Sequence, residues 1–247
     1  MPLKQLFQLF KIFLCILLAI PEYWRKVSLL PATSKPIAQA LWLHQLCQRT
    51  LKACHVKIES RGSLPKGGVL VSNHMTYLDI LVLCSLTPCV FVSKKEVARW
   101  PVFGSLARMA GTLFLNRSQR GDVARVGEEM QGLVRDGAMV VFFPEGTTSN
   151  GEDILPFKTS LFEVVLAAKS PLTVVALQYH LEKGEAKAEA AWTNTSFFRH
   201  FWSLLKHDVK VCAVWGESFA PGTEDRKILA VQAREVMCTL RQKAVFN

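Results

Sequence analysis

Between residues 69 and 243, short apolar runs alternate with longer stretches in which apolar residues recur every three or four positions. Short apolar runs are typical of strands buried on both faces of a sheet, and they predict strands at 69–72, 89–92, 111–115, 138–143, 172–179 and 209–215. The intervening stretches predict helices at 78–86, after Pro101, and at 122–135, 161–169 and 223–243, the last with Thr223 as its N-cap. Strands that alternate with helices predict an α/β fold, a layered and mostly parallel sheet flanked by helices.

The N-terminal residues follow a different pattern. Residues 12–20 form an unbroken apolar run, IFLCILLAI, which ends at Pro21. As a helix this run would be only about 13 Å long, too short to cross a bilayer. An extension back to Leu3 reaches about 27 Å, which leaves open both a tilted transmembrane helix and a helix lying in the membrane interface. A cleaved signal peptide fits less well, because no cleavage pattern of small residues follows the run.

A second helix is predicted over residues 36–56. Leu43, Leu46 and Leu51 recur on one side of it and polar residues on the other, and such an apolar face can lie on the protein's own core or on a membrane. The segment RGSLPKGG then marks a boundary, because Gly and Pro interrupt regular structure. We therefore expect two parts: a hydrophobic and amphipathic helical pair at 1–60 that binds a membrane, and an α/β domain at 61–247.

The charge distribution supports a membrane as partner. The formal net charge is +10, and residues 1–61 contain nine basic residues but only two acidic ones. A basic segment that is also rich in Leu, Ile and Phe suits an anionic membrane surface. Nucleic acid fits less well and is not expected, because the basic residues stand within apolar sequence and no zinc-finger or RNA-binding signature is present. A hydrophobic content of 50% excludes an intrinsically disordered protein.

The seven cysteines include no Cys-x-x-Cys pair, and most lie in apolar runs. Buried free thiols are typical of proteins kept in a reducing compartment. No group of Cys and His residues has the spacing of a zinc site, so no metal is expected.

Polar residues follow three of the predicted strands. Asn73 and His74 come after 69–72, Asn116 and Arg117 after 111–115, and Pro144-Glu145-Gly146-Thr147 after 138–143. In open α/β sheets, ligands bind in the crevice beyond the carboxyl ends of the strands. These side chains are therefore expected to meet in one site.

His74 and Asp79 are spaced as a base and the carboxylate that orients it. With His74 on the loop after a strand and Asp79 in the first turn of the next helix, the carboxylate can fold back and fix the imidazole tautomer. The chain contains no Gly-x-Ser-x-Gly nucleophile motif, so we expect His74 to deprotonate an acceptor alcohol directly. Thr76 and Asp79 also match a helix capping box, a structural role that Asp79 can fill at the same time.

Two further features suit an anion. A guanidinium such as that of Arg117 at a strand end suits a phosphate or carboxylate, although a solvated surface arginine fits the same sequence. In FPEGTTS, at 143–149, Pro and Gly flank an acidic residue. Backbone N–H groups and hydroxyls there are free to face an anion or an oxyanion, and a simple tight turn is the alternative.

In order along residues 69–220, these motifs resemble the glycerolipid acyltransferase superfamily, in particular the 1-acylglycerol-3-phosphate acyltransferases. NHMTYLD (73–79) is similar to the NHx4D catalytic block, and FVSKKEVARWPVFG (91–104) to the segment around a substrate-contacting lysine. GTLFLNR (111–117) resembles the acceptor-phosphate block, FPEGTTS the FPEGT block, and VVALQY (174–179) the last, apolar block. Five blocks in the family's order are far more specific than any single one.

The resemblance implies a role for each site residue. His74 is the base and Asp79 its orienting carboxylate, and the implied substrate contacts are Asn73, Lys94, Arg117, Glu145, Gly146 and Thr147. It implies transfer of a fatty acyl chain from acyl carrier protein or coenzyme A to the sn-2 hydroxyl of lysophosphatidic acid, giving phosphatidic acid. This reaction takes place at the cytoplasmic face of the cell membrane and uses no metal or organic cofactor.

Two positions depart from the family pattern. Asn116 stands where the family often has Asp, and Thr148 stands where FPEGTRS proteins carry Arg, so one cation is missing unless Lys158 replaces it. Residues 143–158 also resemble the lyso-ornithine lipid acyltransferase branch, which makes lyso-ornithine lipid or another lysophospholipid the alternative acceptor. A non-catalytic protein that binds lipid at the membrane surface is a third hypothesis, based on the basic apolar N-terminus.

Overall fold

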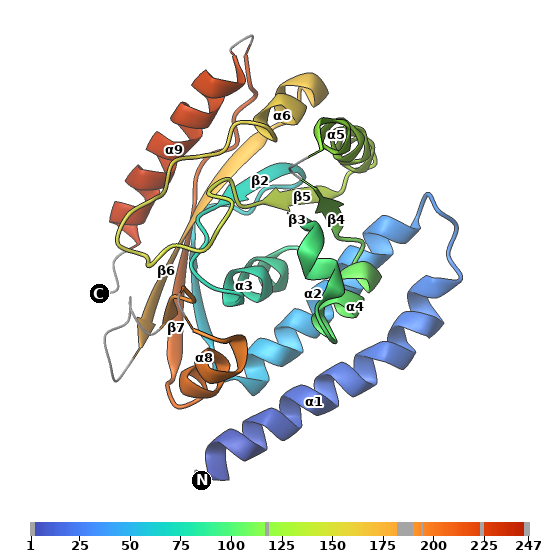
Figure 1. Ribbon diagram of the computed structural model, residues 1–247, viewed down its shortest axis with the longest axis vertical. Coiled ribbons are helices and arrows are strands. Elements are labelled where there is room, and N and C mark those ends of the chain that lie inside the picture. Colours follow the sequence, from blue (N-terminus) through green and yellow to red (C-terminus); the bar gives the residue numbers. More distant parts are fainter. Residues whose placement is uncertain (1–2, 117–118, 182–189, 194, 223–224, 245–247) are drawn as a thin grey trace.

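The computed structural model describes residues 3–116, 119–181, 190–193, 195–222 and 225–244. These residues form one sheet in the order β1-β7-β6-β2-β5-β3-β4 (Figure 1). The strands are β1 Lys57–Arg61, β2 Gly68–Ser72, β3 Val90–Lys94, β4 Leu113–Leu115, β5 Met139–Phe142, β6 Leu172–Leu181 and β7 Val209–Trp215. All neighbouring pairs are parallel except β6 and β7. The predicted fold class, a mostly parallel sheet flanked by helices, is confirmed.

Helices cover both faces of the sheet. They are α1 Leu3–Tyr23, α2 Lys35–Ala53, α3 Leu78–Leu86, α4 Phe103–Met109, α5 Arg120–Arg135, α6 Phe162–Ala168, α8 Phe197–Leu204 and α9 Arg226–Lys243, with a π-helical turn η1 Trp24–Ser28 and a 3-10 turn η2 Lys95–Arg99. One core lies between the sheet and α5, α6 and α9, and the other lies between the sheet and α2, α3 and α8. Successive residues of β2 enter opposite cores, so the strand is apolar throughout, as expected of a strand buried on both faces.

Most predicted elements are present, and α3 and β7 have the predicted bounds. Two elements were not predicted, β1 and α8. The sequence of β1, KIESR, is largely exposed and polar because the strand lies at the sheet edge, so it lacks the apolar run by which the other strands are recognised. Because β1 pairs with β7, the sheet includes residues 57–60, and the boundary expected between residues 60 and 61 falls inside a strand.

The start of the last helix also differs from the prediction. Thr223, the expected N-cap, lies outside the described residues. The helix begins at Arg226, and the Asp225 side chain caps it by accepting a hydrogen bond of 2.8 Å from the backbone N–H of Lys227. An aspartate at this position satisfies one of the free N–H groups of the first turn.

The N-terminal helices pack on each other and on the body of the protein. The helix is longer than the apolar run that ends at Pro21, since α1 continues to Tyr23 and into η1. Packing outweighs the helix-breaking effect of proline there: Tyr23 and Val27 are buried against α2, and the indole of Trp42 donates to the carbonyl of Ala19 at 2.9 Å. The apolar face of α2 lies on the protein's own core, next to α3. The sequence left open whether this face lies on the protein core or on a membrane, and in the structure it lies on the core.

The opposite face of α1 is apolar and exposed. Its side chains are 39–85% exposed and comprise Leu3, Leu6, Phe7, Phe10, Phe13, Leu14, Leu17, Leu18 and Ile20. Within the described part of the chain, the segment Leu3–Ser28 is the one helix long and apolar enough to cross a membrane by length and composition. In Figure 1, α1 is the outermost helix, beyond α2. Large exposed apolar surfaces mark sites of membrane or protein contact.

Gly68 fixes the entry into the central strand β2. Its φ is +92°, and a Cβ atom there would lie 2.5 Å from the carbonyl oxygen of Pro171. Because this oxygen belongs to the backbone that accepts the hydrogen bond from Val69, it cannot simply move away. We expect Gly68→Ala to lower the free energy of unfolding by at least about 2 kcal/mol, measured by urea denaturation. Gly132→Ala, inside α5, where a Cβ meets no atom within 4 Å, is the control and should raise the free energy of unfolding by about 0.5–1 kcal/mol, since alanine favours a helix.

Candidate active site

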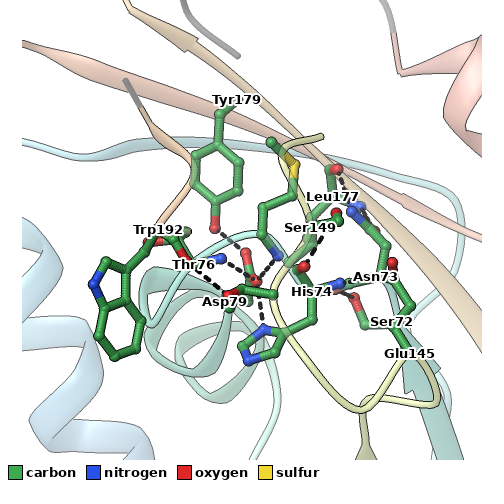
Figure 2. A network of polar contacts seen from close by, with 12 residues as sticks. Ser72, Asn73, His74, Thr76, Asp79, Glu145, Ser149, Leu177, Tyr179 and Trp192 are labelled. Atoms are coloured by element: carbon green, nitrogen blue, oxygen red, sulfur yellow. Dashed lines mark hydrogen bonds and ion pairs between the residues drawn. The ribbon is translucent and has the colours of Figure 1, made fainter. Parts of the chain in front are cut away.

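His74 and Asp79 meet at the end of β2, as the sequence predicts. His74 lies on the loop after the strand, and Asp79 lies in the first turn of α3. The Nδ1 atom of His74 is 2.8 Å from Oδ2 of Asp79 (Figure 2). A carboxylate only accepts hydrogen bonds, so Nδ1 carries the proton, and Nε2 is the nitrogen with a free lone pair. The imidazole is held flat against the ring of Phe143, with the ring centroids 4.0 Å apart.

Asp79 is fully buried and accepts three further hydrogen bonds. The backbone N–H groups of Met75 and Thr76 donate to Oδ2 at 2.7 and 2.9 Å, and the hydroxyl of Tyr179 donates to Oδ1 at 2.5 Å (Figure 2). Burial, reinforced by the Asp79 charge, holds the pKa of Tyr179 well above its usual value, so the phenol keeps its proton and donates. Three donors besides His74 therefore fix the carboxylate that orients the imidazole.

The capping box is half formed. The Asp79 carboxylate accepts from the N–H of Thr76, as in a capping box, but the hydroxyl of Thr76 is buried without a hydrogen-bond partner among the described residues. Asp79 therefore closes the loop and orients His74 with the same oxygen atom. The two roles that the sequence left open are combined in one side chain.

Asn73, a predicted substrate contact, is held inside the fold by the neighbouring strand. Its side chain is fully buried, and its amide bonds the backbone of Leu177 in β6 twice. The carbonyl oxygen accepts from the Leu177 N–H at 2.8 Å, and the amide nitrogen donates to the Leu177 carbonyl at 3.0 Å. Through these two bonds Asn73 connects the His74 loop to the neighbouring strand.

Glu145, also a predicted substrate contact, positions the loop that carries the base. It is 2% exposed, and its two oxygens accept from the N–H of His74 at 2.7 Å and the N–H of Leu155 at 3.0 Å. Burial raises the pKa of Glu145, and these two donated bonds partly oppose the rise. Glu145 thus joins the FPEGT loop to the backbone of the base.

The helix α9 is also connected to the loop that bonds Glu145. The guanidinium of Arg234 donates to the carbonyls of Ile154 and Leu155 at 2.6 and 3.3 Å. Leu155 in turn donates to Glu145, which accepts from His74. A chain of hydrogen bonds therefore runs from the last helix to the base.

A cavity of about 310 Å³ opens beside His74. Its apolar wall is contributed by β3, β4, β5 and the start of α6, through Val92, Leu115, Phe142 and Leu161. Three of the predicted substrate contacts line it, Lys94, Gly146 and Thr147. Arg117 lies outside the described residues. The arrangement combines a base, a cation and an apolar wall in one space, which suits a substrate with an anionic group and a hydrocarbon chain.

Thr148 has a partner that the sequence did not indicate. Its hydroxyl donates to the carbonyl of Trp192 at 2.7 Å, and the N–H of Trp192 donates to the carbonyl of Met75 at 2.8 Å. Trp192 lines the cavity, and its indole contacts that of Trp100 with centroids 5.7 Å apart. Lys158 does not replace the missing cation, since its side chain is exposed and does not line the cavity.

A second cavity, the cysteines and the potential metal ligands complete the description. A smaller cavity of about 170 Å³ is lined by Lys95, Glu96, Arg99 and Asn116. All seven cysteines are free, and five of them are buried, as predicted. No group of three or more His, Cys, Asp or Glu side chains among the described residues could hold a metal ion.

A family model described as Acyltransferase matches residues 55–178, half of the chain. The chain belongs to the acyltransferase family. The matched region includes His74, Asp79 and Glu145, so the site lies within the part that carries the likeness. This acyltransferase is 33% identical to a 1-acyl-sn-glycerol-3-phosphate acyltransferase of Neisseria gonorrhoeae over 69% of this chain and 68% of that protein.

Other relatives are named for a different acceptor lipid. A lyso-ornithine lipid O-acyltransferase of Brucella abortus is 33% identical to the acyltransferase over 77% of this chain and 78% of that protein. Among solved structures, the 1-acyl-sn-glycerophosphate acyltransferase PlsC of Thermotoga maritima matches with a TM-score of 0.72 over 99% of this chain and 97% of the other, at 17% identity. This last likeness shows that the fold is shared.

Proposed function

We propose that this acyltransferase transfers a fatty acyl chain from an acyl-carrier-protein or coenzyme A thioester to the sn-2 hydroxyl of lysophosphatidic acid, giving phosphatidic acid. The observation that carries the proposal is the His74–Asp79 pair, with Nδ1 and Oδ2 2.8 Å apart, beside a cavity that also contains Lys94. An acceptor with a hydroxyl, a phosphate and a chain fits this set of groups. The named activity of the Neisseria relative supports the same acceptor.

The proposed mechanism follows from the orientation of the imidazole. Nε2 of His74 takes the proton of the acceptor hydroxyl as its oxygen attacks the thioester carbonyl, and Asp79 stabilises the imidazolium that forms. Collapse of the tetrahedral intermediate breaks the carbon–sulfur bond, and the leaving thiolate takes the proton from Nε2. Lys94 and the hydroxyl of Thr147 line the same cavity and are the groups placed to bind the acceptor phosphate or the developing oxyanion.

Lyso-ornithine lipid is the second candidate acceptor. Thr148 supplies no positive charge to the cavity, and its hydroxyl is already bonded to Trp192. Several relatives are named for this acceptor, including the Brucella protein. The non-catalytic alternative is not retained, because the chain belongs to an enzyme family and presents an oriented base at its cavity.

A direct competition tests the proposal. Membranes that contain the protein are offered labelled palmitoyl thioester with lysophosphatidic acid and lyso-ornithine lipid together, and the product lipids are separated. We expect labelled phosphatidic acid as the main product. Predominant acylation of lyso-ornithine lipid would reject the first acceptor and keep the mechanism, and no labelled product from either lipid would reject both.

The acceptor preference should depend on position 148. Thr148→Arg adds a cation to the cavity and removes the bond to the Trp192 carbonyl. We expect this variant to increase the ratio of kcat/KM for lysophosphatidic acid to that for lyso-ornithine lipid by about tenfold, the size of one charge-assisted hydrogen bond. Thr148→Val, which removes the same bond without adding charge, is the matched control. An equal change in both variants would show that the added charge has no effect.

We further propose that α1 holds the protein at the cytoplasmic face of the cell membrane. Phe7, Phe10 and Phe13 are about 60% exposed on its outer face. Their replacement by serine should reduce co-sedimentation with anionic vesicles by at least about tenfold, because three aromatic side chains no longer enter the acyl region. Thermal unfolding provides the control and should be unchanged within a few degrees. Undiminished sedimentation would contradict the proposal.

A further inference from the structure

The turn before α4 holds an apolar side chain in a strained conformation. The N–H of Phe103 donates to the carbonyl of Pro101 at 2.7 Å, and between them Val102 has φ +62° and ψ −59°. This is a γ-turn with positive φ at its centre, a rare and strained form. A β-branched residue is especially unfavourable there. Val102 is nevertheless 56% exposed, so packing within the protein does not explain its side chain.

The turn is built into the fold. A Cβ atom at Gly104 would lie 2.4 Å from the carbonyl oxygen of Ala98, so only glycine allows α4 to begin this close to η2. The N–H of Gly104 donates to the Trp100 carbonyl at 2.9 Å, and the guanidinium of Arg108 donates to the Ala98 carbonyl. Strain persists only where the surrounding structure imposes it, and these contacts hold the side chain of Val102 outward.

Val102 is one of four exposed apolar side chains on neighbouring elements, which we call the rim patch: Trp100, Val102, Phe103 and Phe198. The ring of Phe103 contacts that of Phe197 at 4.9 Å, and Phe197 contacts Phe198, which is 80% exposed, at 5.5 Å. The patch therefore spans α4 and α8. Trp100 and its neighbour Trp192 both line the cavity of His74, so the rim patch lies at the mouth of the candidate active site.

The charges around the rim patch are mostly positive. Exposed basic residues stand on the same elements, Lys95 and Arg99 on η2 and Arg199 on α8. Glu96 is the one acidic residue in the described segments 94–109 and 195–206. Exposed aromatic and aliphatic side chains with flanking Lys and Arg match the composition of surfaces that bind anionic bilayers.

We propose that the rim patch inserts into the bilayer surface, so that the mouth of the cavity opens onto lipid and the lysolipid acceptor enters without crossing water. The proposal rests on the function proposed above and adds a second contact to that of α1. An acidic acyl carrier protein would also be attracted by the charges. The bilayer is favoured because the most exposed side chains, those of Val102 and Phe198, are apolar.

Kinetics with two forms of the acceptor test the proposal. The rim variant is Val102→Ser/Phe103→Ser/Phe198→Ser in the full chain. The matched control is Ile228→Ser/Val231→Ser on α9, where Ile228 and Val231 are 52% and 57% exposed and α9 covers the opposite face of the sheet (Figure 1). Each protein is assayed with long-chain acceptor in phosphatidylglycerol vesicles and with short-chain acceptor dissolved as monomers.

The rim variant should raise KM for the vesicle-bound acceptor about tenfold and leave kcat/KM for the dissolved acceptor unchanged. The control should behave as wild type in both assays. Equal KM values for the rim variant and wild type, equal losses with both acceptors, or a rise confined to the KM of the acyl donor would each overturn the proposal. The last outcome would assign the patch to the carrier protein instead.

Two further measurements keep the test independent of stability and of activity. Val102→Gly/Phe198→Ser relieves the positive φ and removes two apolar side chains, so it serves if the triple variant is unstable. Brominated lipids quench tryptophans that enter the acyl region, and Trp100→Phe should show less quenching than wild type. Equal quenching would overturn the proposal. Failure of the wild type to acylate even the dissolved acceptor would instead reject the proposed function, which the quenching does not require.

Discussion

Replacement of His74 by alanine is expected to lower the rate of acyl transfer by about 10²- to 10⁴-fold, the usual contribution of a general base. Nδ1 of His74 is bonded to Asp79, so Nε2 is the atom that would take the proton of the acceptor hydroxyl. KM for the acceptor should change little, because the base contacts only the reacting hydroxyl. Initial rates with labelled thioester, at saturating and at low acceptor concentration, give both quantities.

The fold should survive this substitution. The side chain of His74 is 18% exposed, and Asp79 keeps three of its four hydrogen-bond donors without it. The melting temperature should therefore fall by no more than a few degrees. His180→Ala removes an exposed histidine on β6 that does not line the cavity and serves as the control. A His74→Ala protein that is folded and retains a normal rate would refute the mechanism.

The second large effect is expected at Asp79. Four donors converge on this buried carboxylate, and Asp79→Asn turns an N–H₂ group toward at least one of them. A buried donor without an acceptor is costly, so we expect the free energy of unfolding to fall by at least about 2 kcal/mol. The rate should also fall, because the imidazole loses its fixed tautomer. The loss of stability distinguishes Asp79→Asn from His74→Ala, which should lower mainly the rate.

Tyr179→Phe separates the two roles of Asp79. It removes only the donor to Oδ1 and leaves the contact between His74 and Oδ2 in place. We expect a loss of about 1.5–3 kcal/mol in the free energy of unfolding, because the bond is to a buried charged group, and a rate that is reduced far less than in Asp79→Asn. Denaturant titrations and transfer assays of the two variants make the comparison. A rate loss as large in Tyr179→Phe as in Asp79→Asn would contradict the assignment of the orienting role to Oδ2.

Local sequence was enough to predict the contact between His74 and Asp79. Both residues belong to one strand–loop–helix unit, so the apolar run before His74 and the helix after Thr76 place them on neighbouring turns of the chain. The strands that are buried on both faces were predicted for the same reason, because each is marked by its own apolar run. The edge strand β1 lacks that mark, and it was missed.

The roles of Asn73 and Glu145 could not be read from the sequence, because their partners are distant along the chain. Asn73 bonds a residue 104 positions away, and Glu145 bonds the N–H of a residue 71 positions away. Tyr179 and Trp192 were missed as well. Tyr179 stands in an apolar run that resembles core, and Trp192 follows a charged, Ala-rich stretch that carries no motif. One signal was available for Tyr179: a tyrosine in a strand buried on both faces requires a partner for its hydroxyl.

The contacts with β6 also determine when the site can form during synthesis. Asp79 bonds the hydroxyl of Tyr179, 100 residues later in the chain, and Asn73 bonds Leu177. Until β6 leaves the ribosome, the carboxylate lacks its fourth donor and the His74 loop lacks its attachment to the neighbouring strand. Closing so large a loop is a slow, late step in folding. α1 is complete long before then, so the nascent chain can reach a membrane before it holds an organised catalytic base.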